Sequence, residues 1–462
     1  MHAARDRPVD RHPRGVAVLS ATEMAERFSY YGMMALLALY MNKQLLMPGH
    51  AENVLGLAGL RHFFEFRGPM SNQAFASLIT GWYGGMVYFT PMIGGWLADR
   101  VLGTKRTVVL GLMLMMGGHV AMSFDRSFLI ALLLLIAGSG CLKGNVAAQV
   151  GMLYPANEES RRARGYAIFS TGINIGAVAG PLAAGSVAQA SGFHAGFALA
   201  AALMLVALGV YLGGQRFLPD TGAVKAARAA MAPLTSDEKR RCALLLAIIL
   251  LNVPAEMAYA TIWNIGTLWI DQRVDLASPL GQVPPSWFNA LDSLGSILVV
   301  VPLVALWAFQ ARRGSEYDSF TKIAIGSLFV SASAALMMIG ALLAGQGKVS
   351  FIWPICAFLG IGVGFMWYWP VTLALVSQTA PPKAAATMVS VAYISSFFGA
   401  IMSGWVGSFY SVMGNASFWA LDAAIPLVGA AAIFAFRPSL KRALFGEKPD
   451  FAQADLAMQS SG

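Results

Sequence analysis

The residues best suited to chemistry stand near the N-terminus, where Glu23, Glu26 and Arg27 lie at the start of an apolar stretch. At 3.6 residues per helical turn, Glu23, Arg27 and Tyr30 or Tyr31 share one face, with Glu26 beside them. An arginine can hold a carboxylate through two parallel hydrogen bonds. A buried carboxyl group can change its protonation when its charged neighbours engage a ligand. The pattern therefore predicts a site for a charged ligand, coupled to proton binding.

Composition shows which solvent surrounds this helix. The chain has 462 residues, of which 57% are hydrophobic and 12% charged, and its mean hydropathy is +0.61. Soluble proteins carry about 25% charged residues. Apolar stretches of about 20 residues, long enough to cross a bilayer, recur along the whole chain. The 48 glycines suit close helix–helix contact in lipid. The composition predicts an all-α polytopic membrane protein.

Twelve membrane spans are predicted. They begin near Val16, Ser71, Thr107, Phe128, Gly165, Gly196, Arg241, Pro285, Thr321, Val349, Ala384 and Ser417. With both termini inside, 24 of the 32 Lys and Arg residues fall in cytoplasmic segments and 6 in outer loops, while Arg27 and Lys143 lie within spans. This is the positive-inside rule, so the net charge of +9 reports topology and gives no support to nucleic-acid binding.

The spans form two halves of six, separated by a polar, basic stretch. The expected organisation is a cytoplasmic segment 1–15, a six-helix bundle 16–215, a cytoplasmic linker 216–240, a second six-helix bundle 241–437 and a cytoplasmic tail 438–462. This organisation is similar to that of the major facilitator superfamily.

Several stretches carry a closer resemblance. "GGWLADRVLGTKRT" resembles the superfamily's loop signature between its second and third spans. "EMAERFSYYG" resembles the E-x-x-E-R-F-x-Y-Y-G signature of the proton-dependent oligopeptide transporter family, and all seven specified positions match. Further stretches resemble the family's second, fourth, fifth and tenth spans: "WYGGMVYFTPMIGGWLADRVLG" with Tyr83 and Tyr88, "GSGCLKGNVAAQVGMLY" with Lys143, "FSTGINIGA" with Asn174, and "WPVTLALVSQTAPP".

The resemblance implies a proton-coupled symporter that imports di- and tripeptides by alternating access. Peptides are zwitterions, so a site needs cations for one end and an anion for the other. Arg27 and Lys143 are suited to the peptide carboxylate, and Glu23 and Glu26 to proton coupling. Other side chains can hydrogen-bond a peptide backbone without reading its side chains: Tyr30, Tyr31, Tyr83, Tyr88 and Asn174.

Departures from the family pattern affect the amino-terminal end of the peptide. Phe365 occupies the position of the family's tenth-span glutamate, and Asp292 stands at a family asparagine. We therefore expect Asp292, assisted by Asn174, to bind the peptide ammonium. The alternative is that Asp292 ties spans together through a partner such as Arg273. If the anchor lies elsewhere, Glu256 in the seventh span is the next candidate.

Aromatic residues near these positions are ambiguous. Trp263, Trp367 and Trp369 are more often packing or lipid-facing residues than pocket walls, although Trp367 beside Phe365 could line one. Among the histidines, His119 is the one inside a confident span, and we expect it to be a packing residue.

Other functions stay open at this point. Glu26 and Arg27 could be a neutralising structural pair. An intramembrane enzyme with carboxylate metal ligands would need more His or Glu residues on neighbouring spans, and the spans supply Arg and Lys instead. A major facilitator transporter of another small zwitterion, an organic anion or a drug is the nearer alternative. We expect no cofactor beyond protons as the coupling ion, no metal, and a monomer in the cell (inner) membrane.

Overall fold

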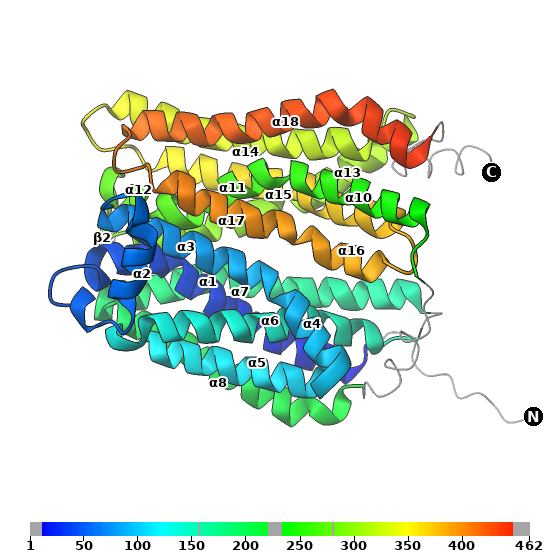
Figure 1. Ribbon diagram of the computed structural model, residues 1–462, viewed down its shortest axis with the longest axis horizontal. Coiled ribbons are helices and arrows are strands. Elements are labelled where there is room, and N and C mark those ends of the chain that lie inside the picture. The colour runs from blue at the N-terminus through cyan, green and yellow to red at the C-terminus, as the bar shows by residue number, and fades with distance from the viewer. Residues whose placement is uncertain (1–11, 156–157, 220–232, 280, 447–462) are drawn as a thin grey trace, which may run out of the picture.

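The computed structural model describes residues 12–155, 158–219, 233–279 and 281–446. Its helices run side by side along the longest axis (Figure 1). The chain enters α1 and leaves α18 at one end, called the proximal end, and the opposite end is called the distal end. Residues 220–232 of the predicted linker and residues 447–462 of the predicted tail lie outside the described residues.

The first part of the chain forms six rods. They are α1 (Arg14–Tyr40), α3 (Asn72–Phe89) with α4 (Pro91–Leu97) and η4 (Ala98–Leu102), α5 (Thr104–Met122), α6 (Phe128–Met152), α7 (Glu159–Ser191) and α8 (Phe193–Gly214). Short elements join them: η1 (Met41–Leu45), η2 (Ala51–Asn53), α2 (Leu57–Phe64), η3 (Glu65–Arg67), η5 (Asp125–Ser127) and η6 (Gln215–Phe217).

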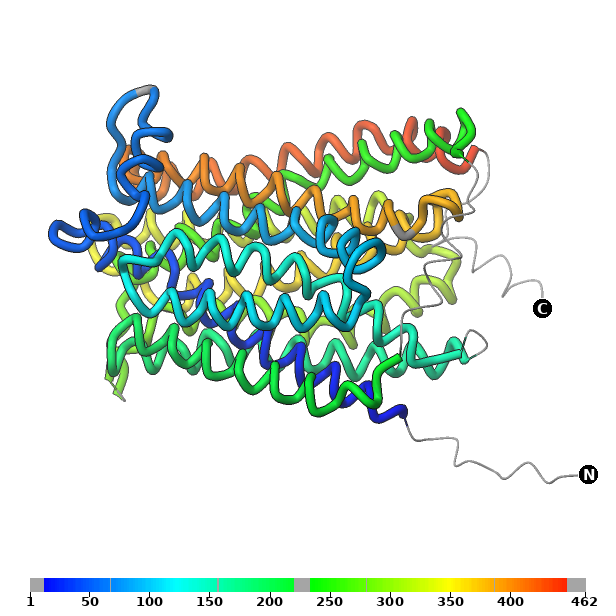
Figure 2. Tube along the Cα trace, turned by 60° about the horizontal axis from the view of Figure 1, so that its bottom comes forward, coloured from blue at the N-terminus to red at the C-terminus, as the bar shows by residue number. Residues whose placement is uncertain are grey.

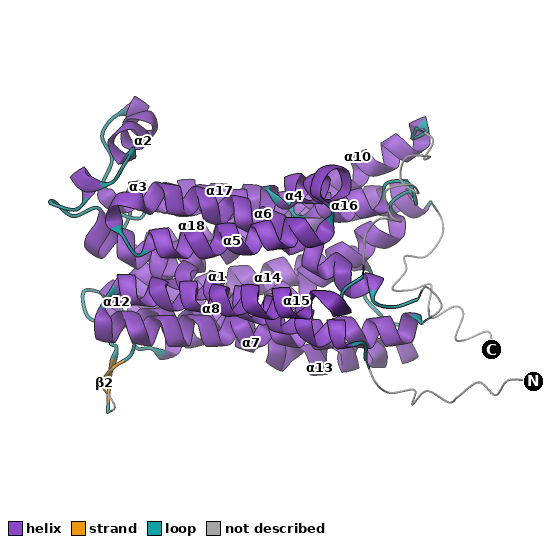
Figure 3. Cartoon of the chain, turned by 90° about the horizontal axis from the view of Figure 1, so that it is seen from below, coloured by secondary structure: helices purple, strands orange, loops and turns teal. Residues whose placement is uncertain are grey.

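The second part forms six more. They are α10 (Ser236–Leu251) with α11 (Val253–Thr261), η7 (Ile262–Gly266) and α12 (Thr267–Arg273), η8 (Pro285–Asn289) with α13 (Ala290–Arg312), α14 (Ser319–Ala344), α15 (Ile352–Thr379), α16 (Ala385–Ala392) with α17 (Ile394–Gly407), and α18 (Asn415–Phe445). A small distal hairpin pairs β1 (Ala277–Ser278) with β2 (Gly281–Gln282), and α2 projects from the same end (Figure 3).

The described residues thus form twelve rods, in agreement with the predicted spans. By length and composition, nine helices among the described residues could cross a membrane, and α1, with four charged side chains, is not among them. Several helix ends differ from the prediction. The helix α7 begins at Glu159, before the predicted start near Gly165. A capping box between Thr235 and Glu238 starts α10 before Arg241, and α18 continues through Pro438 to Phe445.

The rods form two groups that follow the chain order (Figures 1 and 2). In the first group α1 packs on α7 and α8, and in the second α14 packs on α15 and α18. The α1–α7 contact depends on glycine. A Cβ atom on Gly176 would lie 2.3 Å from the Met24 carbonyl oxygen, and one on Gly180 would lie 2.4 Å from that of Phe28. Glycine therefore lets the two backbones touch.

The two groups meet along a seam in the distal half. A Cβ atom on Gly81 of α3 would lie 2.6 Å from the Gly404 Cα atom of α17, so these helices are in backbone contact. Lys43 Nζ and Asp271 Oδ1 form an ion pair of 2.8 Å across the same seam. Further hydrogen bonds cross it from Asn264 to Ser77, from Gln73 to the Gly407 carbonyl and from Trp287 to the Leu182 carbonyl.

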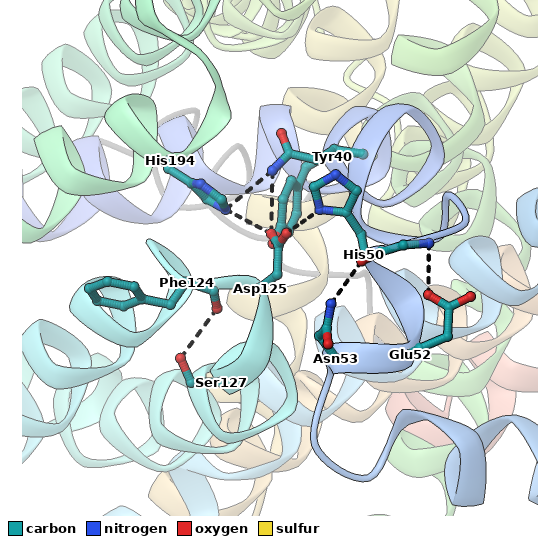
Figure 4. A network of polar contacts seen from close by, with 10 residues as sticks. Tyr40, His50, Glu52, Asn53, Phe124, Asp125, Ser127 and His194 are labelled. Carbon is teal, nitrogen blue, oxygen red and sulfur yellow. Dashed lines mark hydrogen bonds and ion pairs between the residues drawn. The ribbon is translucent and has the colours of Figure 1, made fainter.

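A polar network closes the distal end of the first group (Figure 4). Asp125 accepts a hydrogen bond of 2.6 Å from the Tyr40 hydroxyl. The same carboxylate lies 2.5 Å from His50 Nδ1 and 2.8 Å from His194 Nε2. Its partners come from α1, α8 and the loop after α1, so Asp125 fixes the distal end of the helix that carries the predicted site.

Candidate functional site

The charged residues of α1 lie together in the interior. Glu23, Glu26 and Arg27 are 5%, 1% and 6% exposed. Arg27 Nε lies 3.0 Å from Glu23 Oε1 and 2.5 Å from Glu26 Oε2. However, both Glu26 oxygens and Arg27 Nε and Nη2 lack hydrogen-bond partners of good geometry among the described residues. Arg27 is thus close enough to both carboxylates for electrostatic attraction. Its buried N–H groups still have unused donors that a ligand could accept from.

Lys143 of α6 lies beside this cluster, and no carboxylate among the described residues forms an ion pair with it. Its Nζ atom stands 4.1 Å from the Tyr88 ring centre and 5.0 Å from that of Tyr30. The Arg27 guanidinium carbon is 5.5 Å from the Tyr30 ring centre. Tyr83 is buried, and its hydroxyl has no hydrogen-bond partner in the described part of the chain. Two cations, Arg27 and Lys143, therefore converge on the ring of Tyr30.

A cavity of about 530 Å³ lies between the two groups of helices. Tyr31 of α1 and Trp263 of η7 face each other from the two groups, with ring centres 5.2 Å apart. The residues that line the cavity are Tyr30, Tyr31, Met34, Thr80, Gly81, Gly84, Tyr88, Glu256, Tyr259, Ala260, Trp263, Asn264, Ser396, Ala400 and Ser403.

Of the two candidate ammonium anchors, Glu256 lines the cavity and Asp292 does not. Glu256 is 5% exposed, and its Oε1 atom has no hydrogen-bond partner among the described residues. Asp292 is buried behind Tyr259, whose hydroxyl donates to Asp292 Oδ2 over 2.8 Å. Among the described residues no ion pair joins Arg273 to Asp292, and Arg273 donates to the Gly345 carbonyl instead.

Helix geometry separates Phe365 from Trp367. Phe365 stacks on the cavity residue Tyr259 at 5.1 Å between ring centres. Trp367 instead packs edge-on against Trp307 at 5.6 Å and beside Phe329, inside the second group. Residues two apart on a helix point about 200° apart, so both could not face the cavity. The expectation that Trp367 could line the cavity is therefore corrected: Trp367 is a packing residue.

Asn174 of α7 is half-buried and does not line the cavity. His119 is fully buried in α5 and is a packing residue, but neither ring nitrogen has a hydrogen-bond partner among the described residues. In the part of the chain that the structure describes, no group of three or more His, Cys, Asp or Glu side chains could hold a metal ion.

Comparison with known proteins assigns the family. The sequence profile of the Major Facilitator Superfamily matches residues 19–404. The chain belongs to the Major Facilitator Superfamily. Among its relatives, a di-/tripeptide transporter of Lactococcus lactis subsp. cremoris is 28% identical, and the alignment covers 93% of this chain and 96% of that protein. The peptide transporter YePEPT of Yersinia enterocolitica is 26% identical, with 86% and 88% covered.

Solved structures agree with these relatives. A mutant of the peptide transporter POT in complex with alafosfalin is 26% identical, with a TM-score of 0.81 over 95% of this chain and 97% of that one. The resemblance to proton-dependent oligopeptide transporters is thereby confirmed. This major facilitator chain is a multi-pass membrane transporter and not an enzyme.

Part of the transporter's cavity was missed from the sequence. Trp263, expected to be a packing residue, lines the cavity with Tyr259 and Asn264. A signal was present, because Glu256, Tyr259 and Trp263 follow the three-and-four spacing of one helix face. Ser396 and Ser403 of α17 also share a face, but serine is too common in membrane helices for that spacing to single them out.

Proposed function

We propose that this transporter is a proton-coupled symporter that imports di- and tripeptides by alternating access. The observation that carries the proposal is the distribution of charge about the cavity. Glu256 of the second group lines the cavity. Arg27 and Lys143 of the first group do not line it, but both lie against the ring of Tyr30, which does. A peptide zwitterion of matching length would satisfy both groups. The printed names of the relatives in Lactococcus and Yersinia support the same substrate class.

Tyrosines suit such a substrate because they bind what all peptides share. Tyr30, Tyr31 and Tyr88 line the cavity, and a phenol can donate to a backbone carbonyl and accept from a backbone amide. Tyr83 and Asn174 belong to the same proposed set, although neither lines the cavity in this conformation.

Proton coupling is proposed to reside in Glu23 and Glu26. Both carboxylates share one guanidinium in this conformation. When a peptide carboxylate takes up Arg27, the two acids lose part of their counter-charge, and a proton is the cheapest replacement in a buried site. Binding of peptide and binding of a proton would then favour each other.

We propose that the transporter lies in the cell (inner) membrane as a monomer. Its proximal end would face the cytoplasm. The excess of basic residues in the proximal segments supports this orientation. Protons would be the coupling ion and the lipid bilayer the surroundings, with no cofactor required by the proposed cycle.

Reconstituted protein tests the proposal. Proteoliposomes with an acidic exterior should accumulate a labelled dipeptide and lose it on addition of a protonophore. Glu23→Gln and Glu26→Gln should abolish accumulation but keep exchange of peptide for peptide, because exchange needs no net proton release. Glu159→Gln, which changes an exposed acid on α7, is the matched control.

Three results would overturn the proposal. Accumulation that ignores the proton gradient would remove symport. Normal accumulation by both glutamine variants would make the carboxylates structural. Uptake of another zwitterion, an organic anion or a drug, with dipeptides failing to compete, would replace the substrate class.

A further inference from the structure

A short segment at the distal end turns phenylalanine side chains outward. It consists of α2 and η3, residues 57–67, and is called the distal arm. Phe63 and Phe66 are 68% and 76% exposed, whereas Leu57 at the start of the arm is 3% exposed. The arm is therefore amphipathic in the folded chain, because one face packs on the protein and an apolar face lies outside it.

The inner face of the arm is fixed to the start of α3 by Arg61. Arg61 Nη1 donates to Asn72 Oδ1 over 2.8 Å, and Nη2 donates to the Met70 carbonyl over 2.9 Å. Its Nε atom lies 2.9 Å from Glu65 Oε1, so the charge of Arg61 is paired within the arm. The guanidinium carbon also stands 5.4 Å from the ring centre of Phe75 on α3. Because these contacts hold the arm on the first turn of α3, its outward face has a defined direction.

The position of the arm shows what covers that face. The arm projects sideways from the bundle of rods at the distal end, next to α3 and α17 (Figure 3). A hydrogen bond of 3.0 Å between Ser71 Oγ and Ser411 Oγ joins the distal ends of these two rods. The rods run along the longest axis (Figure 1), and in a multi-pass protein this axis crosses the bilayer. Lipid therefore surrounds the sides of the bundle, and an arm that projects sideways meets lipid.

The neighbouring rod α17 carries exposed apolar side chains near the same end. Trp405 and Val412 are 56% and 80% exposed, and the ring of Trp405 packs edge-on against that of Phe409 at 5.2 Å between ring centres. In a chain that crosses a membrane, exposed aromatic side chains near the end of a span mark the boundary between the hydrocarbon and the headgroups. The distal end of α17 thus presents the same kind of surface as the arm.

We propose that the distal arm is a lipid anchor, whose residues Phe63 and Phe66 insert among the headgroups and upper acyl chains of the leaflet at the distal end. The anchor binds by burial of apolar surface, because the charge of Arg61 is already paired. It is fixed to α3, the rod that carries Gly81 of the seam, so it moves with α3 when the seam opens. The anchor depends neither on the substrate nor on proton coupling.

Spin labelling of the full-length protein in phosphatidylcholine vesicles tests the anchor. A nitroxide is attached to Phe63→Cys, in a variant whose native cysteines are replaced by alanine. The controls are Glu52→Cys, at an exposed position of the same loop, and Val301→Cys, at a position of α13 that is 74% exposed. Dioxygen concentrates in hydrocarbon and a nickel chelate stays in water, so the ratio of their collision rates with the nitroxide reports its depth. The ratio at position 63 should be several-fold higher than at position 52 and approach that at position 301. Equal ratios at positions 63 and 52 would overturn the proposal.

Photocrosslinking keeps the native cysteines and identifies what covers the arm. The amino acid p-benzoylphenylalanine replaces Phe63 with a similar shape, and on irradiation it inserts into C–H bonds within its reach. The protein should gain the mass of one phospholipid, and the same amino acid in place of Glu52 should give no such adduct. A covalent dimer that is lost when each vesicle holds a single copy would assign the face to a second copy of the chain and overturn the anchor. The absence of both adducts would place the arm in water and overturn it as well. Neither measurement needs transport, so both stay decisive if the proposed function fails.

Discussion

The anchor for a peptide's amino terminus can be decided between Glu256 and Asp292. Glu256 borders the cavity with an oxygen free of hydrogen bonds, whereas Asp292 is reached only through Tyr259. A direct contact between a carboxylate and the substrate ammonium requires the first arrangement. We therefore expect Glu256→Gln to lose most of the discrimination between dipeptides with free and acetylated amino termini, and Asp292→Asn to lose less.

The size of the effect follows from the burial. A hydrogen bond to a charged group in a buried site contributes roughly 1.5–3 kcal/mol. Since 1.4 kcal/mol corresponds to a tenfold change in affinity, native protein should prefer the free amino terminus by roughly 10- to 150-fold, and Glu256→Gln by only a few-fold. Competition binding of the matched peptide pair to detergent-purified protein measures both.

Tyr259→Phe is the control that separates the two acids. It removes the hydroxyl donated to Asp292 and keeps the ring that stacks on Phe365. If Asp292 acts by positioning Tyr259, this variant should resemble Asp292→Asn. Full discrimination in Glu256→Gln together with its loss in Asp292→Asn would refute the reasoning from the cavity wall and restore Asp292 as the direct anchor.

Three further changes have defined outcomes. Lys143→Ala should weaken binding of dipeptides with a free carboxylate by about tenfold or more and of amidated dipeptides much less, and equal losses in competition assays would assign Lys143 to gating. Gly81→Ala should prevent closure of the distal seam, because its Cβ atom would lie 2.6 Å from Gly404 Cα. A single cysteine introduced at the distal end should then react faster with a thiol reagent. An unchanged rate of labelling would contradict the contact. Lys43→Ala should change distal labelling only slightly, because its pair with Asp271 is half-exposed on the lysine side and is worth about 0.2–1 kcal/mol; a large increase would show that the pair holds the seam.

The sequence predicted the helices and the α1 cluster because both depend on local spacing. Long apolar stretches define spans, and residues four apart on α1 must meet, as Glu23 and Arg27 do at 3.0 Å. The opposite wall was harder to predict. Asp292 was expected at the cavity because it stands at a family asparagine, and Trp367 was named as a residue that could line a pocket because it stands beside Phe365. However, the rotation of α13 and α15 about their own axes is set by packing against neighbours.

Such rotations depend on contacts that no single helix contains. A Cβ atom on Gly362 of α15 would lie 1.9 Å from the Asp292 carbonyl oxygen, so the two helices touch at this level and their rotations are fixed together. The Asp292 carboxylate then meets Tyr259 of α11 instead of the cavity. Nothing in either stretch alone encodes that choice.

The two halves of the proposed site are attached to different rigid supports. Arg27 is fixed against α7, because a Cβ atom on Gly176 would lie 2.9 Å from Arg27 Cβ, while Glu256 is on α11 in the second group. A ligand with only one charged end can bind either Arg27 or Glu256, and the other side chain is then left without a counter-charge. A ligand that binds both links the two groups, so its binding free energy depends on how far apart they stand. A peptide with both termini charged would therefore favour the closed conformation of the seam over the open one. Blocking either terminus of the peptide should reduce transport more than it reduces binding.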